Sequence, residues 1–160
     1  MSEQGARIRK VVAAVPDPEL PVLTIAELGI LRGVEITDDG GVTITVTPTY
    51  SGCPALETIR RDVVDAARAA GAERVEVRTV LNPPWSTDWI SEPARRKLRA
   101  AGIAPPGPAA GTAVALRLSV RCPRCGSVDT EQLSRFGPTA CKALWRCHTC
   151  QEPFEHIKAF

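Results

Sequence analysis

The chain has 160 residues, with 20 basic and 18 acidic side chains, a formal net charge of +2 and 44% hydrophobic residues. This balance is too even to indicate nucleic-acid binding by charge alone. The slight basic excess lies in residues 111–160, where the charges are spread along the segment in the way that is typical of a solvated surface.

Targeting signals are not expected. No stretch approaches the roughly 20 apolar residues that a membrane span needs, so we predict no membrane association. The apolar run Val11–Val15 ends at Pro16 and is too short for the core of a signal peptide. A protein without an export signal is expected in the cytoplasm, with reduced cysteines.

The first half of the chain predicts helices over a small sheet. A helix is expected over Arg7–Val15, and the prolines of Pro16–Pro21 predict a stiff, non-helical loop. Strands over Val34–Thr37 and Val42–Thr49, joined by a tight turn, form a hairpin. A helix should then run from Cys53-Pro54 to about Ala70, because apolar residues recur in it at helical spacing.

The second half predicts a strand, a helix, a linker and a small module. The strand is Arg74–Leu81 and the helix is Ile90–Ala101, closed by Gly102. The expected domains are residues 1–103, a proline- and glycine-rich linker at 104–113, and a module at 114–160. In the module we expect a strand at Val114–Val120 and short strands near residues 144–146 and 154–158, with Trp145, Phe136 and Phe154 as its core.

Two Cys-x-x-Cys pairs dominate the module, Cys122/Cys125 and Cys147/Cys150. Each turn can direct two thiolates at one point, so the four sulfurs suit a closed tetrahedral metal site. The intervening 21 residues slightly exceed the usual spacing of about 15–20. A structural zinc is predicted, with iron as the alternative, since sequence does not separate the two. Cys141 is the competing ligand, and disulfides are the other reading of the pattern.

Cys53 is a separate candidate site. Pro54 suits the first position of a helix, which would make Cys53 the N-cap, where the helix dipole favours a thiolate. Hydroxyls of Thr47 and Thr49 and carboxylates of Asp17 and Glu19 could lie near the sulfur. This set predicts a transient site for iron or an iron–sulfur cluster; the alternative is a small, inert, buried Cys53.

No catalytic residue is predicted. The two histidines, His148 and His156, both fall in the module, and neither a phosphate-binding loop nor a dinucleotide-binding glycine motif occurs. An enzyme with its own chemistry is therefore disfavoured.

The segments Asp17-Pro18-Glu19, Thr47–Thr49 and Ser51-Gly52-Cys53-Pro54 with the following helix resemble the iron–sulfur assembly domain family of the SufT-like type. With the segments Pro83–Trp89 and Cys122–Phe154 added, the whole chain is similar to the PaaD family of phenylacetate-degradation proteins. The fold class is accordingly α+β: a small two- or three-layered α/β sandwich with a mixed sheet, followed by a zinc ribbon.

The resemblance implies an accessory subunit of the phenylacetyl-CoA 1,2-epoxidase system that assists metal-centre or iron–sulfur cluster assembly and is not catalytic by itself. The implied partners are the oxygenase subunits of the epoxidase and its iron–sulfur reductase. A non-catalytic subunit that bridges the complex is the alternative. A nucleic-acid-binding ribbon is ranked lowest, so no nucleic-acid partner is predicted, and a homo-oligomer stays open.

Overall fold

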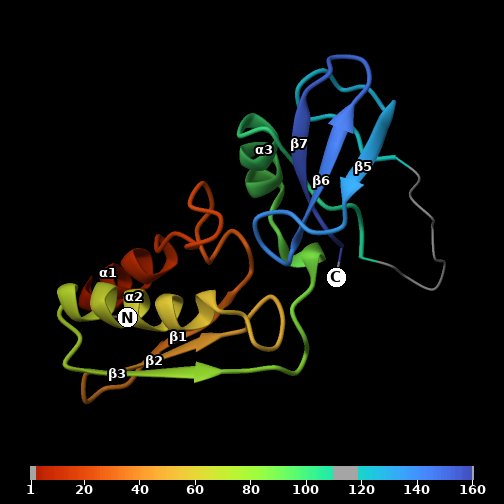
Figure 1. The fold of residues 1–160 in the computed structure, drawn as a ribbon. Helices are drawn as coiled ribbons and strands as arrows, with labels where there is room; N and C mark the ends of the chain where they lie inside the picture. The colour runs from red at the N-terminus through yellow and green to blue at the C-terminus, as the bar shows by residue number, and fades with distance from the viewer. Residues whose placement is uncertain (1–2, 110–118, 160) are drawn as a thin grey trace. The chain divides into compact units, whose positions relative to one another are not determined.

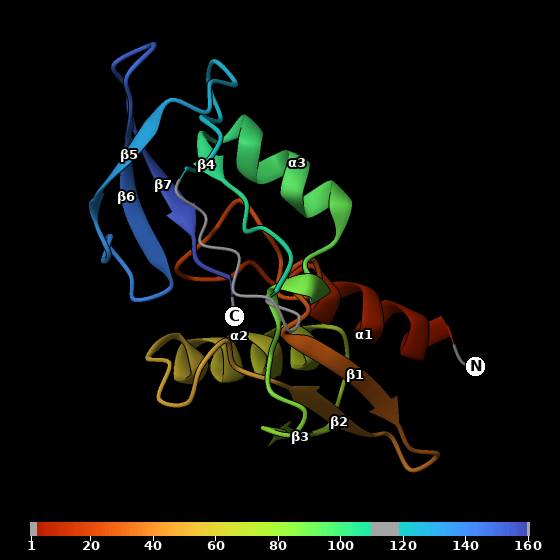
Figure 2. The ribbon, with the colours of Figure 1, turned by 90° about the vertical axis from the view of Figure 1, so that its right-hand side faces the viewer.

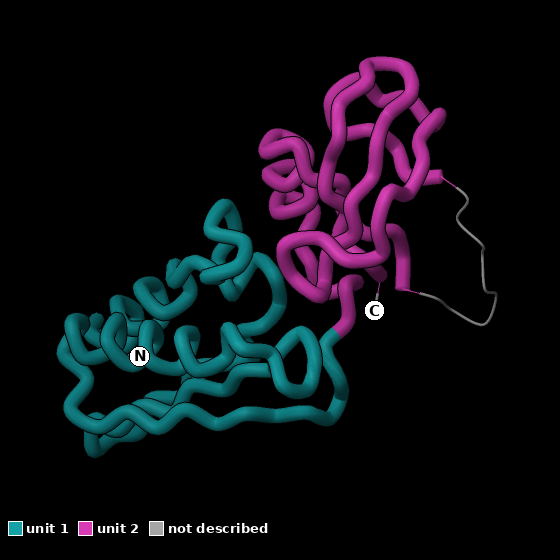
Figure 3. The backbone as a smooth tube through the Cα atoms, in the orientation of Figure 1, with its two compact units in different colours: residues 1–85 teal, residues 86–160 magenta. Residues whose placement is uncertain are grey.

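The computed structural model describes residues 3–109 and 119–159. The chain forms two compact units, residues 1–85 and 86–160, shown in different colours in Figure 3. The division follows Trp85, whereas the sequence placed a domain boundary at residue 103. A compact unit is not the same as an independently folding domain, so the domain boundary at residue 103 stays a prediction.

The first unit contains helices α1 (Glu3–Ala13) and α2 (Ala55–Ala69) and strands β1 (Leu31–Ile36), β2 (Gly41–Val46) and β3 (Arg74–Thr79). Both helices lie on one side of the sheet (Figure 1). The strand order is β1-β2-β3; β1 and β2 form an antiparallel hairpin, while β2 and β3 are parallel. The predicted mixed sheet and the α+β class are confirmed.

Strand β2 carries the centre of the first core. Its Val42, Ile44 and Val46 are buried, as alternation predicts, and Ile44 is paired with Val34 of β1 and Val77 of β3. The helices cover this face with residues that repeat at helical spacing. They are Ile8 and Val12 of α1 and Ile59, Val63 and Ala67 of α2.

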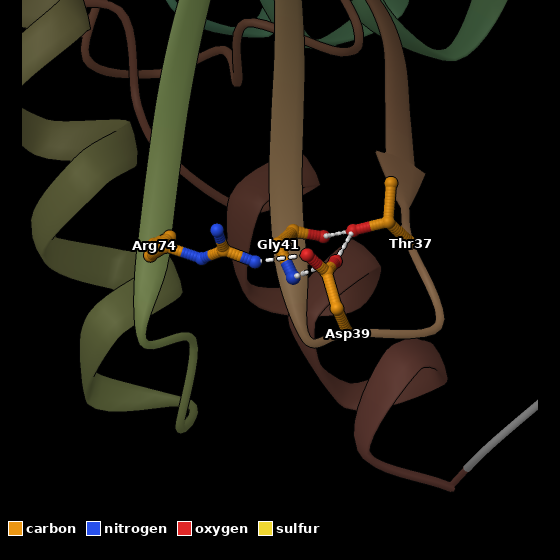
Figure 4. Close-up of polar contacts among 4 residues, drawn as sticks. All are labelled: Thr37, Asp39, Gly41 and Arg74. Atoms are coloured by element: carbon orange, nitrogen blue, oxygen red, sulfur yellow. Dashed lines mark hydrogen bonds and ion pairs between the residues drawn. The ribbon is translucent and has the colours of Figure 1, made fainter.

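The turn between β1 and β2 is held by polar contacts (Figure 4). The Thr37 hydroxyl donates to the Asp39 carboxylate, and the Arg74 guanidinium at the start of β3 donates to the same carboxylate. These contacts, the Thr37 bond first and the Arg74 bond second, lower the pKa of Asp39 to about 2. One side chain thereby connects the hairpin to the third strand.

The second unit contains η1 (Thr87–Trp89), α3 (Glu92–Ala100) and strands β4 (Ile103–Ala104), β5 (Thr130–Ser134), β6 (Lys142–Cys147) and β7 (Pro153–Ile157). Its strand order is β4-β7-β6-β5 (Figure 2). The predicted strands near 144–146 and 154–158 are present and pair with each other. The predicted strand Val114–Val120 lies outside the described residues except for Ser119 and Val120, which belong to no strand.

The core of the second unit combines apolar side chains with metal-turn cysteines. Trp145 and Phe154 are buried, as predicted, and pack with Val120, Cys122 and Cys147. Phe136, by contrast, is 68% exposed, so its placement in the core was wrong. Its ring instead faces the Lys158 ammonium, 4.8 Å from the ring centroid.

None of the described helices has the length and apolar character that crossing a bilayer requires.

Candidate functional site

The four cysteines of the Cys-x-x-Cys turns converge on one point. Their sulfur atoms all lie within 4.8 Å of one another. Across the turns, the Sγ atoms of Cys122 and Cys150 are 3.8 Å apart, and those of Cys125 and Cys147 are 3.5 Å apart. A tetrahedral ion bound at about 2.3 Å from each sulfur separates its sulfurs by about 3.8 Å. The donor set and spacing therefore fit one four-coordinate ion of the zinc type.

The two turns share one backbone design. Gly126, directly after Cys125, has φ +78°, and Gln151, directly after Cys150, has φ +63°. Each residue reverses the chain so that a later N–H reaches the sulfur: Ser127 donates to Cys125, and Glu152 donates to Cys150. Glycine is the usual residue in this conformation, so the positive φ of Gln151 could not be predicted from the sequence, because a non-glycine residue rarely adopts it.

Backbone N–H groups also act on Cys147. The N–H of Cys150 has the largest effect, and with the N–H of Thr149 and the neighbouring sulfurs it lowers the pKa of Cys147 to about 6. Metal binding needs thiolates, so the turn prepares at least one sulfur for coordination near neutral pH.

Cys141 lies outside this group. Among the described residues, the four turn cysteines are the one cluster of three or more ligand-type side chains that could share an ion. Cys141 is buried, and its sulfur lies 3.1 Å from the Thr139 hydroxyl. It therefore serves as an internal control for thiol loss that does not remove a metal ligand.

Cys53 lies in the turn between β2 and α2. The helix begins at Ala55 with Pro54 as its N-cap, so Cys53 precedes the N-cap and the predicted assignment was one residue off. Its backbone carbonyl accepts the N–H of Leu56 at 3.1 Å, and its N–H donates to the Tyr50 carbonyl. These bonds fix the residue at the start of the helix.

The thiol of Cys53 is largely shielded from water, with 9% of the residue exposed. The pKa of Cys53 is raised above 9.0, and burial is the largest cause of the shift. The N–H of Ala55 and the Thr49 hydroxyl, 3.9 Å from the sulfur, oppose the shift. The prediction that Cys53 prefers the thiolate form is therefore wrong. The helix start lowers the pKa, but desolvation outweighs it.

The negative charges of Glu19 and Asp17 both raise the pKa of Cys53, although these residues are distant from it in the sequence. Asp17 is buried, and its Oδ1 accepts the N–H groups of Glu19 at 2.9 Å and Leu20 at 2.8 Å. The loop is further held by the bond from Asp17 N–H to the Leu23 carbonyl. The proline-rich loop is thus an ordered turn that carries two acidic groups.

Thr49 and Thr47 occupy different environments. Thr49 is half-buried and donates to the Cys53 sulfur. Thr47 follows β2, is 2% exposed, and its N–H donates to the Ile30 carbonyl at 2.8 Å. The hydroxyl contact with the sulfur comes from Thr49.

Two families match the two parts of this chain. Residues 106–158 match the PaaD zinc beta ribbon domain, and residues 5–79 match the iron–sulfur cluster assembly protein family. An Escherichia coli protein, provisionally named as one of the subunits of 1,2-phenylacetyl-CoA epoxidase, is 48% identical over 97% of this chain and 93% of its own length.

Shorter relatives match the front part. An Fe-S protein maturation auxiliary factor of Porphyromonas gingivalis is 35% identical over 57% of this chain and 87% of its own length. The crystal structure of a domain of unknown function from Bacillus anthracis is 32% identical, with a TM-score of 0.54, and covers 59% of this chain and 91% of that one. The front fold is therefore shared with stand-alone proteins.

Proposed function

The chain belongs to the PaaD-like family, and from that premise we propose that it is an accessory maturation protein of the phenylacetyl-CoA 1,2-epoxidase system. Its client would be the oxygenase, which would receive its metal centre, or the reductase, which would receive its iron–sulfur cluster. In this role the chain performs no ring epoxidation itself. The relatives of its front part are named as auxiliary factors of iron–sulfur protein maturation, which supports this reading.

One observation carries the proposal: the Cys53 thiol is shielded from water yet lies beside the Thr49 hydroxyl and within the field of two carboxylates. Iron as cargo would displace the thiol proton, because a coordinated thiol is deprotonated outright. The raised pKa of Cys53 favours return of that proton when the cargo leaves. Such a group suits a reversible ligand better than a permanent one.

The four-cysteine ribbon would have a different task. We assign it a structural zinc, held by Cys122, Cys125, Cys147 and Cys150 and supported by the N–H groups of its two turns. A closed set of four sulfurs leaves no coordination position for a substrate. The ion would stabilise a module that is too small to fold well on apolar burial alone.

The test compares Cys53→Ser with Cys141→Ser in cells that express the epoxidase and its reductase. Both variants lose one buried thiol, but Cys141 lies outside the proposed cargo site. We expect normal levels of client polypeptide in both strains and iron-deficient clients in the Cys53→Ser strain alone. Client iron that is equal in the two strains would contradict the maturation role.

The burial and raised pKa of Cys53 also favour a second function, a structural subunit with an inert thiol. In that case the chain bridges the oxygenase and the reductase. Size-exclusion chromatography of the purified components separates the two functions. A stoichiometric complex, formed equally by the wild type and by Cys53→Ser, together with clients of normal iron content, would favour the structural role.

A further inference from the structure

The second unit contains a cavity of about 390 Å³ beside the first metal turn. It lies between the end of α3, the chain after β4 and the segment that enters the turn at Cys122. This volume lies within the range of about 300–1,000 Å³ that is usual for small-ligand sites. The proposed maturation role does not use the cavity.

The charged side chains that line the cavity are all positive. Arg99 and Arg121 line the cavity, and no acidic side chain among the described residues does so. Arginine carries its charge at any physiological pH and offers a planar pair of N–H donors that matches a carboxylate. The lining therefore favours an anion.

The remaining walls are largely apolar. Ala104 and Val120 are buried, and both line the cavity. Three proline rings complete the apolar surface: Pro105, Pro106 and Pro123. An inorganic anion would gain nothing from these walls, whereas an organic anion with an apolar body would gain from its burial there.

Both arginines are anchored by other contacts. Arg121 donates from its guanidinium to the Gly126 carbonyl at 2.6 Å, and Arg99 lies 3.4 Å from the Glu92 carboxylate. The Arg99 side chain is 49% exposed. A guanidinium has five N–H donors, so one bond to the protein fixes its position and leaves donors for a ligand.

We propose that this cavity binds an organic carboxylate, with the carboxylate held by Arg99 and Arg121 and an apolar body against Ala104, Val120 and the prolines. The ligand chemistry has two sources, a free organic acid and the terminal carboxylate of a polypeptide. Because Cys122 and Gly126 belong to the lining, binding would take place directly beside the metal turn.

The test uses zinc-loaded, full-length protein and two fluorescent probes. The anionic probe is 8-anilinonaphthalene-1-sulfonate, and the neutral probe of similar shape is N-phenyl-1-naphthylamine. We expect saturable binding of the anionic probe and a loss of affinity of about tenfold or more in Arg99→Gln/Arg121→Gln. Arg146→Gln, which removes an exposed positive charge of the same unit away from the cavity, should bind as the wild type does.

Competition identifies the source of the carboxylate. Benzoate should displace the probe while benzamide does not if a free acid is the ligand. A short peptide with a free C-terminus should displace it while the amidated peptide does not if a polypeptide is the ligand. Displacement by neither anion, or equal probe affinity in the double variant and Arg146→Gln, would overturn the proposal.

Arg121→Gln removes a bond to the metal turn, so zinc content is measured for each variant. Arg99→Gln leaves that bond intact and gives an independent reading. If Arg99→Gln keeps its zinc and still binds the anionic probe with wild-type affinity, the assignment of Arg99 to the site is wrong.

Discussion

The Thr49 hydroxyl donates to the sulfur of Cys53 across 3.9 Å, at the turn where the chain leaves β2 for α2. Burial is the largest cause of the raised pKa of Cys53, this contact lowers that pKa, and the charges of Glu19 and Asp17 raise it. The state of the thiol is therefore set by groups from two separate segments.

The first prediction concerns the reactivity of Cys53. Because its pKa is raised above 9.0, alkylation by iodoacetamide should be slow at pH 7 and should accelerate only well above that pH. Thr49→Val should raise the pKa further, and Glu19→Gln should lower it. The measurement is the pH dependence of the alkylation rate at Cys53, followed by mass spectrometry. A shift in the same direction for both variants would contradict this account.

The second prediction concerns the metal. Wild-type protein and Cys141→Ser should each hold about one zinc ion per chain, and Cys122→Ser should hold much less, because four sulfurs form one site. Structural zinc contributes about 10–16 kcal/mol of binding free energy in small modules, so removal of the zinc ion by a chelator should unfold the four-cysteine ribbon. The fluorescence of buried Trp145 reports this unfolding. Zinc binding should also release protons, and its affinity should fall as pH falls.

The third prediction concerns acid stability. The folded pKa of Asp39 is about 2, below its ordinary value of 3.8. The contacts of the ionised carboxylate therefore stabilise the folded protein fully above pH 3.8, and this stabilisation is lost as pH falls through 2. Asp39→Asn and Arg74→Gln should both lose less free energy of unfolding than the wild type between pH 5 and pH 2. Urea unfolding at each pH measures this, with Asp38→Asn as the matched control. Wild-type acid sensitivity in Asp39→Asn would contradict the assignment.

The fourth prediction separates the turn from the charge at Asp17. Asp17→Ala leaves two backbone N–H groups without their acceptor and should destabilise the first unit by about 1–3 kcal/mol in urea unfolding. Asp17→Asn retains an acceptor oxygen, so its loss should be smaller. The same variant removes a negative charge and should lower the pKa of Cys53. An unchanged Cys53 pKa in Asp17→Asn would show that the carboxylate acts on the turn alone.

Much of this fold was predictable because local patterns and global packing agree. The alternation of Val42, Ile44 and Val46 identified a buried strand face, and the doubled Cys-x-x-Cys pattern identified the four-sulfur cluster. Strand β5 was missed, because most of Thr130–Ser134 is polar and exposed and it lies at a sheet edge. Its pairing with β6 depends on contacts that no local pattern records.

The state of Cys53 was less predictable than its location. Sequence placed it correctly near the start of a helix, where the dipole favours a thiolate. The opposing effect is desolvation, which depends on how closely the surrounding segments cover the sulfur. Sequence spacing contains no measure of that cover, so the predicted direction of the pKa was wrong.

Because β2 and β3 are parallel, the chain must return to the opposite end of the sheet before β3 begins, and α2 makes that crossing. Cys53 lies at the point of departure. A substitution in the buried face of α2, such as Val63→Ala, would therefore act on the helix that begins directly after Cys53 without removing any ligand-type side chain.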